Sequence, residues 1–279
     1  MTVSPQDVKK LRSKTGAGMG DCKKALVEAD GNFDEAEKIL KKQGLASAAK
    51  RSDRQTSEGS VFFAQNAERL IMAEIRCETD FVAMNEEFLK LGDAVARQAL
   101  SENLSEANEA LTTKVQEAVL ALKENLNIAR IANIAIGAND TIASYSHNNG
   151  LIGTAVILHC EGDCSDTQAL AELGRNLAMH LAAYQPAFLD SSQVDAKVLA
   201  EQEEIFRERA VKENIPEKAR EGYLKGQLKK WLAECCFLDQ GFVKEPKKTV
   251  SKILQDFSKQ NGAEVTLKAY EILRVGAEV

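Results

Sequence analysis

The chain has 279 residues, of which 44% are hydrophobic and only 5% aromatic. Its 36 lysines and arginines against 42 aspartates and glutamates give a net charge of −6, which argues against a nucleic-acid-binding protein with a basic surface throughout. No window reaches the roughly 18 apolar residues of a membrane span, and the N-terminus lacks a signal or transit pattern. We therefore expect a cytoplasmic protein with no membrane or nucleic-acid partner.

Residues 1–45 predict a module of three short helices. Ser4 and Pro5 form an N-cap followed by a proline at the first helical position, and the glycine-rich segment 15–20 separates the first helix from the second. Asn32, with a glutamate three residues later, starts the third helix, which Gly44 is expected to close. Such a minimal bundle resembles the ubiquitin-associated fold, a binding module that carries no chemistry.

A polar stretch, residues 46–60, is the clearest domain boundary and is expected to be a linker. The chain before residue 55 holds 12 basic and 8 acidic side chains, so it is locally basic inside an acidic protein. Two interpretations stay open for this charge: a solvated surface, or a patch that binds an acidic partner.

The rest of the chain predicts an α+β core in two parts, residues 61–139 and 140–193, to which residues 235–279 return. Period-two apolar patterns and turn signals predict its strands, and apolar residues at helical spacing predict its helices. Met84, Phe88, Leu91 and Val95 are expected to share one helical face, and Asn149-Gly150 predicts a hairpin turn. The expected strands are 61–65, 69–77, 128–136, 141–146, 152–160 and 264–273, and the expected helices are 84–101, 107–123, 165–183 and 249–259.

Residues 194–234 change to charged helical sequence and predict a protruding antiparallel hairpin with a turn ending at Pro216. Its apolar stripes are Val194, Val198 and Ile205 on the first helix, and Leu224, Leu228 and Trp231 on the second. Because such a hairpin is too thin to stand alone, we expect it either to dock on the core or to form a homodimer with a second copy.

The fold class is therefore α+β: an N-terminal three-helix ubiquitin-associated-like module, a two-part core of antiparallel sheet plus helices, and a protruding helical hairpin. Six cysteines are scattered without the spacing of a disulfide framework and are expected to be reduced thiols. Cys160 and Cys164 lie beside His159 but lack the second ligand pair that a zinc site needs, so we expect neither a metal nor a cofactor.

Catalytic constellations are missing from the sequence. His159 and His180 lie in apolar elements and are expected to be packed histidines, whereas His147, just before the hairpin turn, is a candidate contact residue. Gly16, Gly18 and Gly20 imitate a phosphate-binding loop, but no strand precedes them and the Gly-Lys-Ser/Thr ending is missing. We expect neither an enzyme nor direct nucleotide binding.

One connection between a strand and a helix does not fit this scheme, and we call its residues Thr79–Val82 the tip. Asp80 and Phe81 place a carboxylate beside a large aromatic ring in a short loop. Phe81 lies three residues before Met84, so it fits the helical apolar face and a core position. It fits equally an exposed apolar and acidic wedge that enters a partner, and the residues alone leave both interpretations open.

The sequence resembles the elongation factor Ts family, the guanine-nucleotide exchange factors of the GTPase elongation factor Tu. The resemblance is carried by segments in family order over nearly the whole chain: 8–26, 77–82, 124–128, 145–147, 179–180 and 241–250. It implies a factor that binds elongation factor Tu·GDP, displaces Mg²⁺ and promotes GDP release so that GTP can bind. The sequence departs from the family pattern at Gly20 and in its C-terminal run, residues 269–279, which is degraded. The second departure puts a partner contact by a longer C-terminal helix in doubt.

The resemblance also assigns roles to single residues. It implies that Thr79, Asp80, Phe81 and Val82 disturb the magnesium site of the GTPase. It places Arg12, Met19 and Lys23 at the GTP-binding domain, and His147 at another domain of the partner. The alternative is an adaptor that uses the ubiquitin-associated-like module, binds tightly and leaves nucleotide release unchanged.

Overall fold

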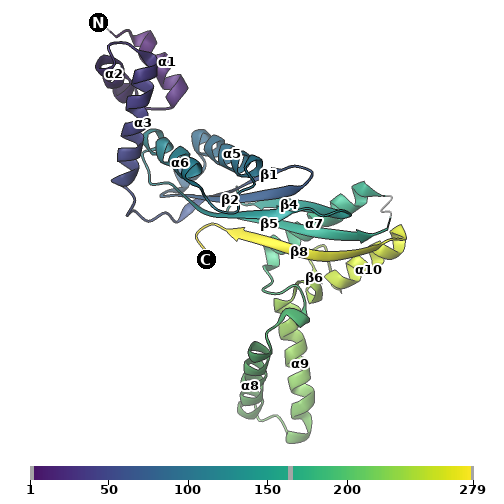
Figure 1. Cartoon of the computed structure of the whole chain (residues 1–279). Helices are drawn as coiled ribbons and strands as arrows, with labels where there is room; N and C mark the ends of the chain where they lie inside the picture. The colour runs from purple at the N-terminus through teal and green to yellow at the C-terminus, as the bar shows by residue number, and fades with distance from the viewer. Residues whose placement is uncertain (1–2, 163–165, 278–279) are drawn as a thin grey trace. The chain divides into compact units, whose positions relative to one another are not determined.

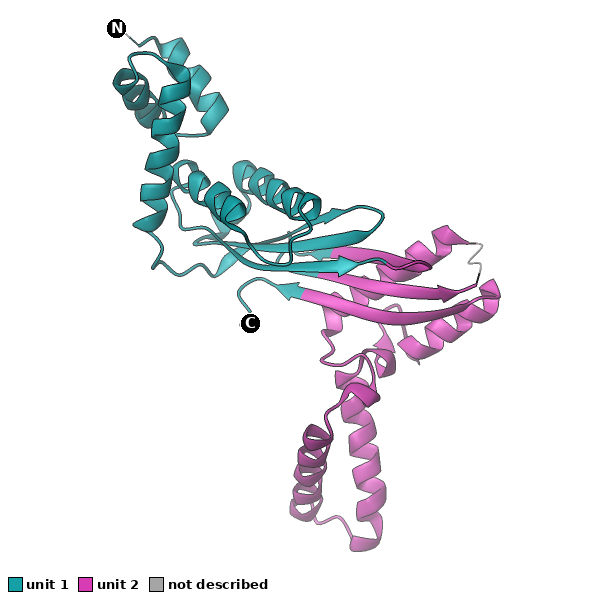
Figure 2. Cartoon of the chain, in the orientation of Figure 1, with its two compact units in different colours: residues 1–136, 146–153, 273–279 teal, residues 137–145, 154–272 magenta. Residues whose placement is uncertain are grey.

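The computed structural model describes residues 3–162 and 166–277, which form two compact units (Figures 1 and 2). The first unit contains residues 1–136, 146–153 and 273–279, and the second contains residues 137–145 and 154–272. We describe each unit by itself. The expected α+β class is confirmed, with N-terminal helices followed by two three-stranded sheets that helices cover.

Three helices form the N-terminal module: α1 (Pro5–Thr15), α2 (Met19–Glu28) and α3 (Phe33–Ala49). The Ser4 hydroxyl accepts a hydrogen bond from Asp7 N at 3.1 Å, and the side chain of Asn32 caps α3 in the same way, as the sequence predicts. The small core of the module is built from buried apolar residues of the three helices and of the connection between α1 and α2: Val8, Leu11, Ala17, Cys22, Ala25, Leu26, Ala36 and Leu40.

Helix α3 does not end at Gly44, so the predicted helix end there is wrong. The helix continues to Ala49, and the linker shortens to the residues before β1 begins at Glu58. A Cβ at Gly44 would lie 3.0 Å from the carbonyl oxygen of Glu117 on helix α6 (Glu109–Leu122). Gly44 therefore permits α3 and α6 to approach each other closely. A glycine in the sequence can indicate either this close packing or the end of a helix.

The first sheet is antiparallel with the order β1-β2-β3, formed by Glu58–Gln65, Arg69–Cys77 and Asn127–Ala135. Helices α5 (Glu86–Ser101) and α6 (Glu109–Leu122) pack against the sheet and share one apolar core with it. Gly92 of α5 lies against the ring of Phe62, where a Cβ would come within 2.2 Å of ring carbons. Phe88 is fully buried in the same core.

Met84 does not share the buried face of α5, so this part of the predicted helical stripe is wrong. It is the C-cap of the short helix α4 (Asp80–Ala83), and its side chain is 57% exposed. The side chain of Asn85 caps α5 by accepting a hydrogen bond from Glu87 N at 2.9 Å, so a new helix begins after Met84. The break between α4 and α5 removes Met84 from the periodicity of Phe88.

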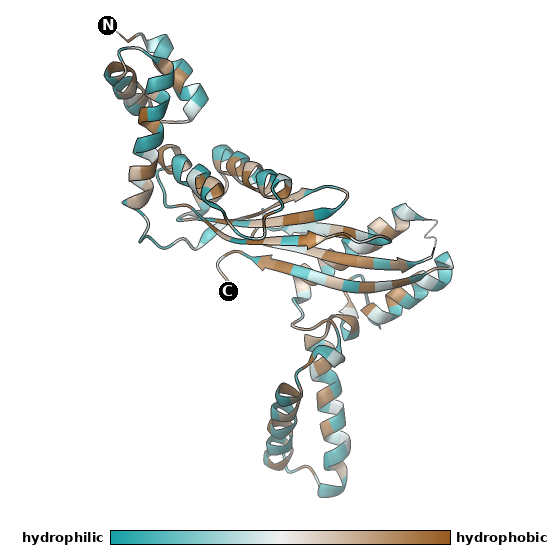
Figure 3. Cartoon of the chain, in the orientation of Figure 1, coloured by the Kyte–Doolittle hydropathy of each residue, from teal (hydrophilic) through white to brown (hydrophobic). Residues whose placement is uncertain are grey.

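The second sheet has the order β4-β5-β8, formed by Asp140–His147, Ile152–Glu161 and Glu264–Arg274. Its central strand β5 is largely hydrophobic and buried (Figure 3). The second unit also contains α7 (Thr167–Tyr184), α10 (Val250–Asn261), the short strands β6 (Gly241–Phe242) and β7 (Glu245–Thr249), and two single-turn helices, Ser191–Gln193 and Phe237–Asp239. Residues of α7, α10 and the sheet form its apolar core.

The predicted helical hairpin is present as α8 (Ala196–Lys212) and α9 (Glu217–Cys235), with Pro216 at the N-cap of α9. The expected apolar stripe on α8 is wrong, because Val198 and Ile205 are 39% and 55% exposed. Phe206 and Ala210 are the buried residues of this helix instead. The aromatic ring takes the inward position, and Ile205 turns toward solvent as a result.

Five cysteines lie in the described part of the chain. Cys22, Cys77, Cys235 and Cys236 are free thiols, but Cys160 is disulfide-bonded, so the expectation of reduced thiols is wrong at that position. Cys164 lies outside the described residues. Among the helices that the structure describes, none combines the length and the apolar composition needed to cross a lipid bilayer.

Candidate functional site

The tip lies at the end of β2 and forms the start of α4. Thr79 is the N-cap of this helix, and its hydroxyl accepts a hydrogen bond from Val82 N at 3.4 Å. The side chain of Phe81 is 79% exposed, so the core interpretation of this residue is wrong. An exposed aromatic ring on a short helix gains almost no burial energy in the free protein.

The four predicted tip residues divide into two exposed and two anchoring side chains. Asp80 and Phe81 face solvent, and the exposed Met84 follows one turn later. Thr79 is half-buried through its capping role, and Val82 packs against the core of the first sheet. The exposed surface here is therefore acidic and apolar: Asp80 and Phe81 of the tip carry it, together with Met84 at the end of α4.

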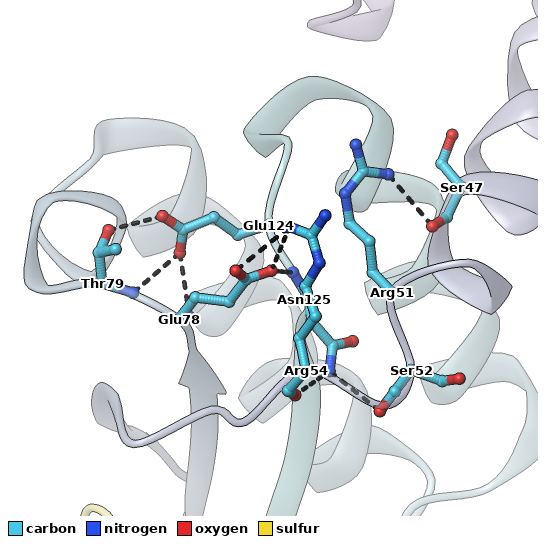
Figure 4. A network of polar contacts seen from close by, with 8 residues as sticks. All are labelled: Ser47, Arg51, Ser52, Arg54, Glu78, Thr79, Glu124 and Asn125. Atoms are coloured by element: carbon cyan, nitrogen blue, oxygen red, sulfur yellow. Dashed lines mark hydrogen bonds and ion pairs between the residues drawn. The ribbon is translucent and has the colours of Figure 1, made fainter.

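A network of polar contacts fixes the start of the tip (Figure 4). The carboxylate of Glu124, from the connection between α6 and β3, accepts hydrogen bonds from Glu78 N and Thr79 N at 3.0 Å and from the Thr79 hydroxyl at 2.6 Å. Glu124 belongs to a segment that carries the family resemblance, but the resemblance assigns it no role. Only its contacts in the folded chain show that it holds the tip.

Glu78 and the segment 124–125 bind each other in both directions, through the Glu78 amide and through the Glu78 carboxylate. Glu78, which donates its amide to Glu124, accepts a hydrogen bond from Asn125 N at 2.6 Å and pairs with Arg54 at 3.3 Å. The buried Asn125 side chain donates to the carbonyl oxygens of Ser52 and Arg54 (Figure 4). The end of β2, the end of α6 and the linker are thereby joined, so the tip stands on a firmly connected base.

Cys77 contributes structure and not reactivity. Burial, together with the nearby negative charges of Glu124 and Glu58, raises the pKa of this thiol to about 12. Its sulfur lies 3.2 Å from the carbonyl oxygen of Thr79 and donates a hydrogen bond to it. A thiol held in the protonated state is a poor nucleophile.

The predicted N-terminal contact residues lie on the surface of α1 and α2. Met19 is 52% exposed, Lys23 lies one turn further along α2, and the 54% exposed Val27 continues the same row. Arg12 is exposed on α1. Burial raises the pKa of the Cys22 thiol on α2, and the positive charge of Arg12 opposes this shift, which places Arg12 near α2. The surface is apolar and basic.

The N-terminal module and the tip are attached to consecutive residues. Lys123, at the C-cap of α6, pairs with Asp21 of α2 at 3.1 Å, and the next residue, Glu124, holds the tip. Lys123 has a positive φ of 65°, which turns the chain sharply. The Lys123 side chain therefore contacts α2, whereas the Glu124 side chain contacts the tip. One turn of the chain therefore supports both candidate contact surfaces.

His147 is exposed at the end of β4, where the sequence places it. The hairpin connection is longer than the predicted two-residue turn and contains three successive positive-φ residues, with Gly150 at 89°. Ser60 of β1 donates to Asn149 O at 2.7 Å, and Val61 N donates to Gly150 O at 2.8 Å. These bonds fasten the loop of His147 to the first sheet.

A groove of about 460 Å³ separates this loop from α4. It is lined by residues of β1, the start of α5, the tip helix and the hairpin: Ser60, Val61, Phe62, Ala83, Met84, Leu89, Ser146, Asn149 and Gly150. The end of α4 and the hairpin loop that follows His147 therefore border the same concave surface, within the first unit.

Of the other two histidines, His180 is packed, as expected, whereas the side chain of His159 is 33% exposed. His180 is fully buried, with Nε2 2.9 Å from Gln240 Oε1 and Nδ1 accepting from Val243 N at 3.0 Å. Burial lowers its pKa, so the neutral ring donates through Nε2. His159 Nδ1 lies 2.7 Å from a carboxylate oxygen of Asp140. Both rings serve the second sheet and its helices.

Comparison with known proteins gives consistent matches over almost the full chain. A family model described as elongation factor TS matches residues 78–277. A protein of Treponema denticola named elongation factor Ts is 37% identical over 277 residues, which cover 99% of each chain. Proteins of the same name from Clostridium botulinum and Syntrophotalea carbinolica are each 39% identical, covering 96% and 99% of this chain and 91% and 94% of their own.

Proposed function

This chain belongs to the elongation factor Ts family, the nucleotide exchange factors of elongation factor Tu, and from this premise we propose that its tip performs the exchange step. As an exchange factor it makes and breaks no covalent bond, and the adaptor interpretation is set aside. We further propose that it acts in the cytoplasm, where translation elongation takes place.

The observation that supports the role of the tip is the exposure of Phe81 on a firmly held base. An exchange factor must bind the nucleotide-free or magnesium-free GTPase better than the loaded form, because equal affinity would shift nothing. The Phe81 ring enters the GTPase and separates elements that hold the metal. Asp80 places a carboxylate near those elements and alters the polar network around the metal.

The remaining surfaces supply the rest of the differential binding. A release rate raised by about 10³–10⁵-fold requires roughly 4–7 kcal/mol, whereas one buried phenylalanine contributes only about 1.5–3 kcal/mol. We propose that Arg12, Met19 and Lys23 contact the GTP-binding domain and that His147 contacts another domain of the partner. The apolar and basic surface of α1 and α2 and the groove beside the His147 loop support these assignments.

Release of fluorescent GDP from elongation factor Tu, timed by stopped flow with and without Mg²⁺, tests the proposed mechanism. If the tip acts by displacing the metal, Asp80→Ala and Phe81→Ala slow release strongly in Mg²⁺, and the defect shrinks when EDTA has removed the ion. A Lys23→Ala variant is the matched control, since its defect should be similar in both buffers. Equal defects of the tip variants with and without Mg²⁺ would refute metal displacement.

Pairing of two copies through the helical hairpin stays a prediction. The exposed apolar side chains Val198, Ile205 and Val211 on α8 support it. Sedimentation over a range of protein concentrations decides the question, because a dimer of this kind dissociates on dilution.

A further inference from the structure

Glu124 takes the place of a missing strand partner at the end of β2. The ladder pairs of β2 end at Cys77 with β1 and at Arg76 with β3, so the amides of Glu78 and Thr79 lie beyond both ladders. Buried or half-buried amides without an acceptor are costly. A single carboxylate, 45 residues away from Thr79 in sequence, accepts both amides and the Thr79 hydroxyl.

The geometry of α4 depends on this contact through Thr79. The hydroxyl that donates to Glu124 at 2.6 Å also accepts the hydrogen bond of Val82 N. Helix α4 has only four residues, and a helix of one turn is not stable by itself. Because its N-cap is oriented by Glu124, the direction in which Phe81 points is set by Glu124 as well.

We propose that Glu124 is a positioning residue for nucleotide exchange, an inference that rests on the proposed role of the tip. It acts through Thr79, and it orders the tip before the partner arrives. A tip that is already ordered pays no ordering entropy when Phe81 enters the GTPase. A loosened tip pays that entropy cost in the step that releases GDP. Loss of the Glu124 side chain therefore lowers the maximal release rate more than it lowers the affinity for the GTPase.

Two substitutions at this position separate geometry from charge. Glu124→Ala removes all three acceptor contacts. Glu124→Gln keeps the length of the side chain, so its carbonyl oxygen accepts the two amides while its NH₂ group donates to the Thr79 hydroxyl, which can reverse its role. Glu117→Ala is the matched control, because this carboxylate lies on α6, seven residues before Glu124, and its ion pair is with Lys41 of α3 at 3.6 Å.

Two measurements on the full-length protein test whether Glu124 orders the tip and whether that order speeds GDP release. Amide hydrogen exchange of the free protein should be at least about tenfold faster at Glu78 and Thr79 in Glu124→Ala and unchanged there in Glu117→Ala. In GDP release, measured over a range of factor concentrations, Glu124→Ala should lower the plateau rate about tenfold, as for the loss of one charge-assisted hydrogen bond. The half-saturating concentration should change little, and Glu124→Gln should recover most of the plateau.

The outcomes separate this inference from the proposed function. A folded Glu124→Ala variant with the wild-type plateau rate, beside a slow Phe81→Ala variant, overturns the positioning role and leaves the role of the tip intact. A wild-type plateau in Phe81→Ala overturns both. An equal loss in Glu117→Ala, or a lowered unfolding temperature with unchanged amide protection at the tip, shows that Glu124 is merely structural.

Discussion

Two phenylalanines seven positions apart, Phe81 on α4 and Phe88 on α5, should respond to truncation in opposite ways. Phe81 is 79% exposed in the free protein, whereas Phe88 is fully buried in the core of the first sheet. Truncating an exposed ring removes little apolar burial, so Phe81→Ala should leave the free energy of unfolding within about 0.5 kcal/mol of the wild type. Phe88→Ala removes a buried ring and should cost about 3–5 kcal/mol.

The functional effects should reverse this order. If Phe81 is buried only in the complex with the GTPase, its loss removes about 1.5–3 kcal/mol of transition-state stabilisation. At about 1.4 kcal/mol per factor of ten, release of GDP at a fixed subsaturating factor concentration should slow about 10- to 150-fold. Phe88→Ala should retain release activity in proportion to the folded fraction.

Urea unfolding gives the stabilities, and stopped-flow release of fluorescent GDP gives the rates, with both variants assayed well below their unfolding midpoints. Phe81→Leu is a graded control, because it keeps part of the apolar surface and should lie between Ala and the wild type. The reasoning is refuted if Phe81→Ala is destabilised by several kcal/mol, or if it releases GDP at the wild-type rate.

Two further predictions concern the loop of His147 and the second sheet. Gly150→Ala should cost more than Gly31→Ala, because both have positive φ but only the Cβ at Gly150 would fall 2.0 Å from the Ser60 hydroxyl; equal unfolding midpoints would contradict this. Burial raises the pKa of the Asp140 carboxyl, but hydrogen bonds such as that from Lys268 at 2.6 Å outweigh it and lower the value overall. The stabilisation of the fold by the charged Asp140 carboxylate is therefore complete above its unfolded-state pKa of ~4. It is lost as the pH falls toward the lowered folded-state pKa. The stability gap between wild type and Lys268→Met should close in acid, and a gap independent of pH would count against the pair.

Local signals in the sequence were sufficient for most element types. Ser4 and Asn32 predict helix starts because a cap acts within three residues of itself, and the pattern of the strands in the first sheet follows from side chains that alternate along the chain. The family resemblance pointed to the tip and to His147 through short motifs. The exposure of Asp80, Phe81 and His147 agrees with those assignments, and their functional roles stay predictions.

One error arose where a distant partner decides the outcome, and two arose where neighbouring residues compete for the inward face. Gly44 carries the signal of a helix end, yet α3 continues through it because the backbone of α6 lies directly against it. Met84 and Ile205 fit apolar stripes at helical spacing. They are exposed because a helix break and a competing aromatic ring, respectively, set which face is turned inward.

The sequence by itself determined the family, the α+β class and the short segment that offers a carboxylate beside an aromatic ring. Only the tertiary structure decided that Phe81 lies in solvent while Phe88 lies in the core, and that Glu124 holds the tip. The physical reason is that caps and periodicity act over a few residues. Burial and hydrogen bonding are decided by groups that meet only after folding, here 45 positions apart.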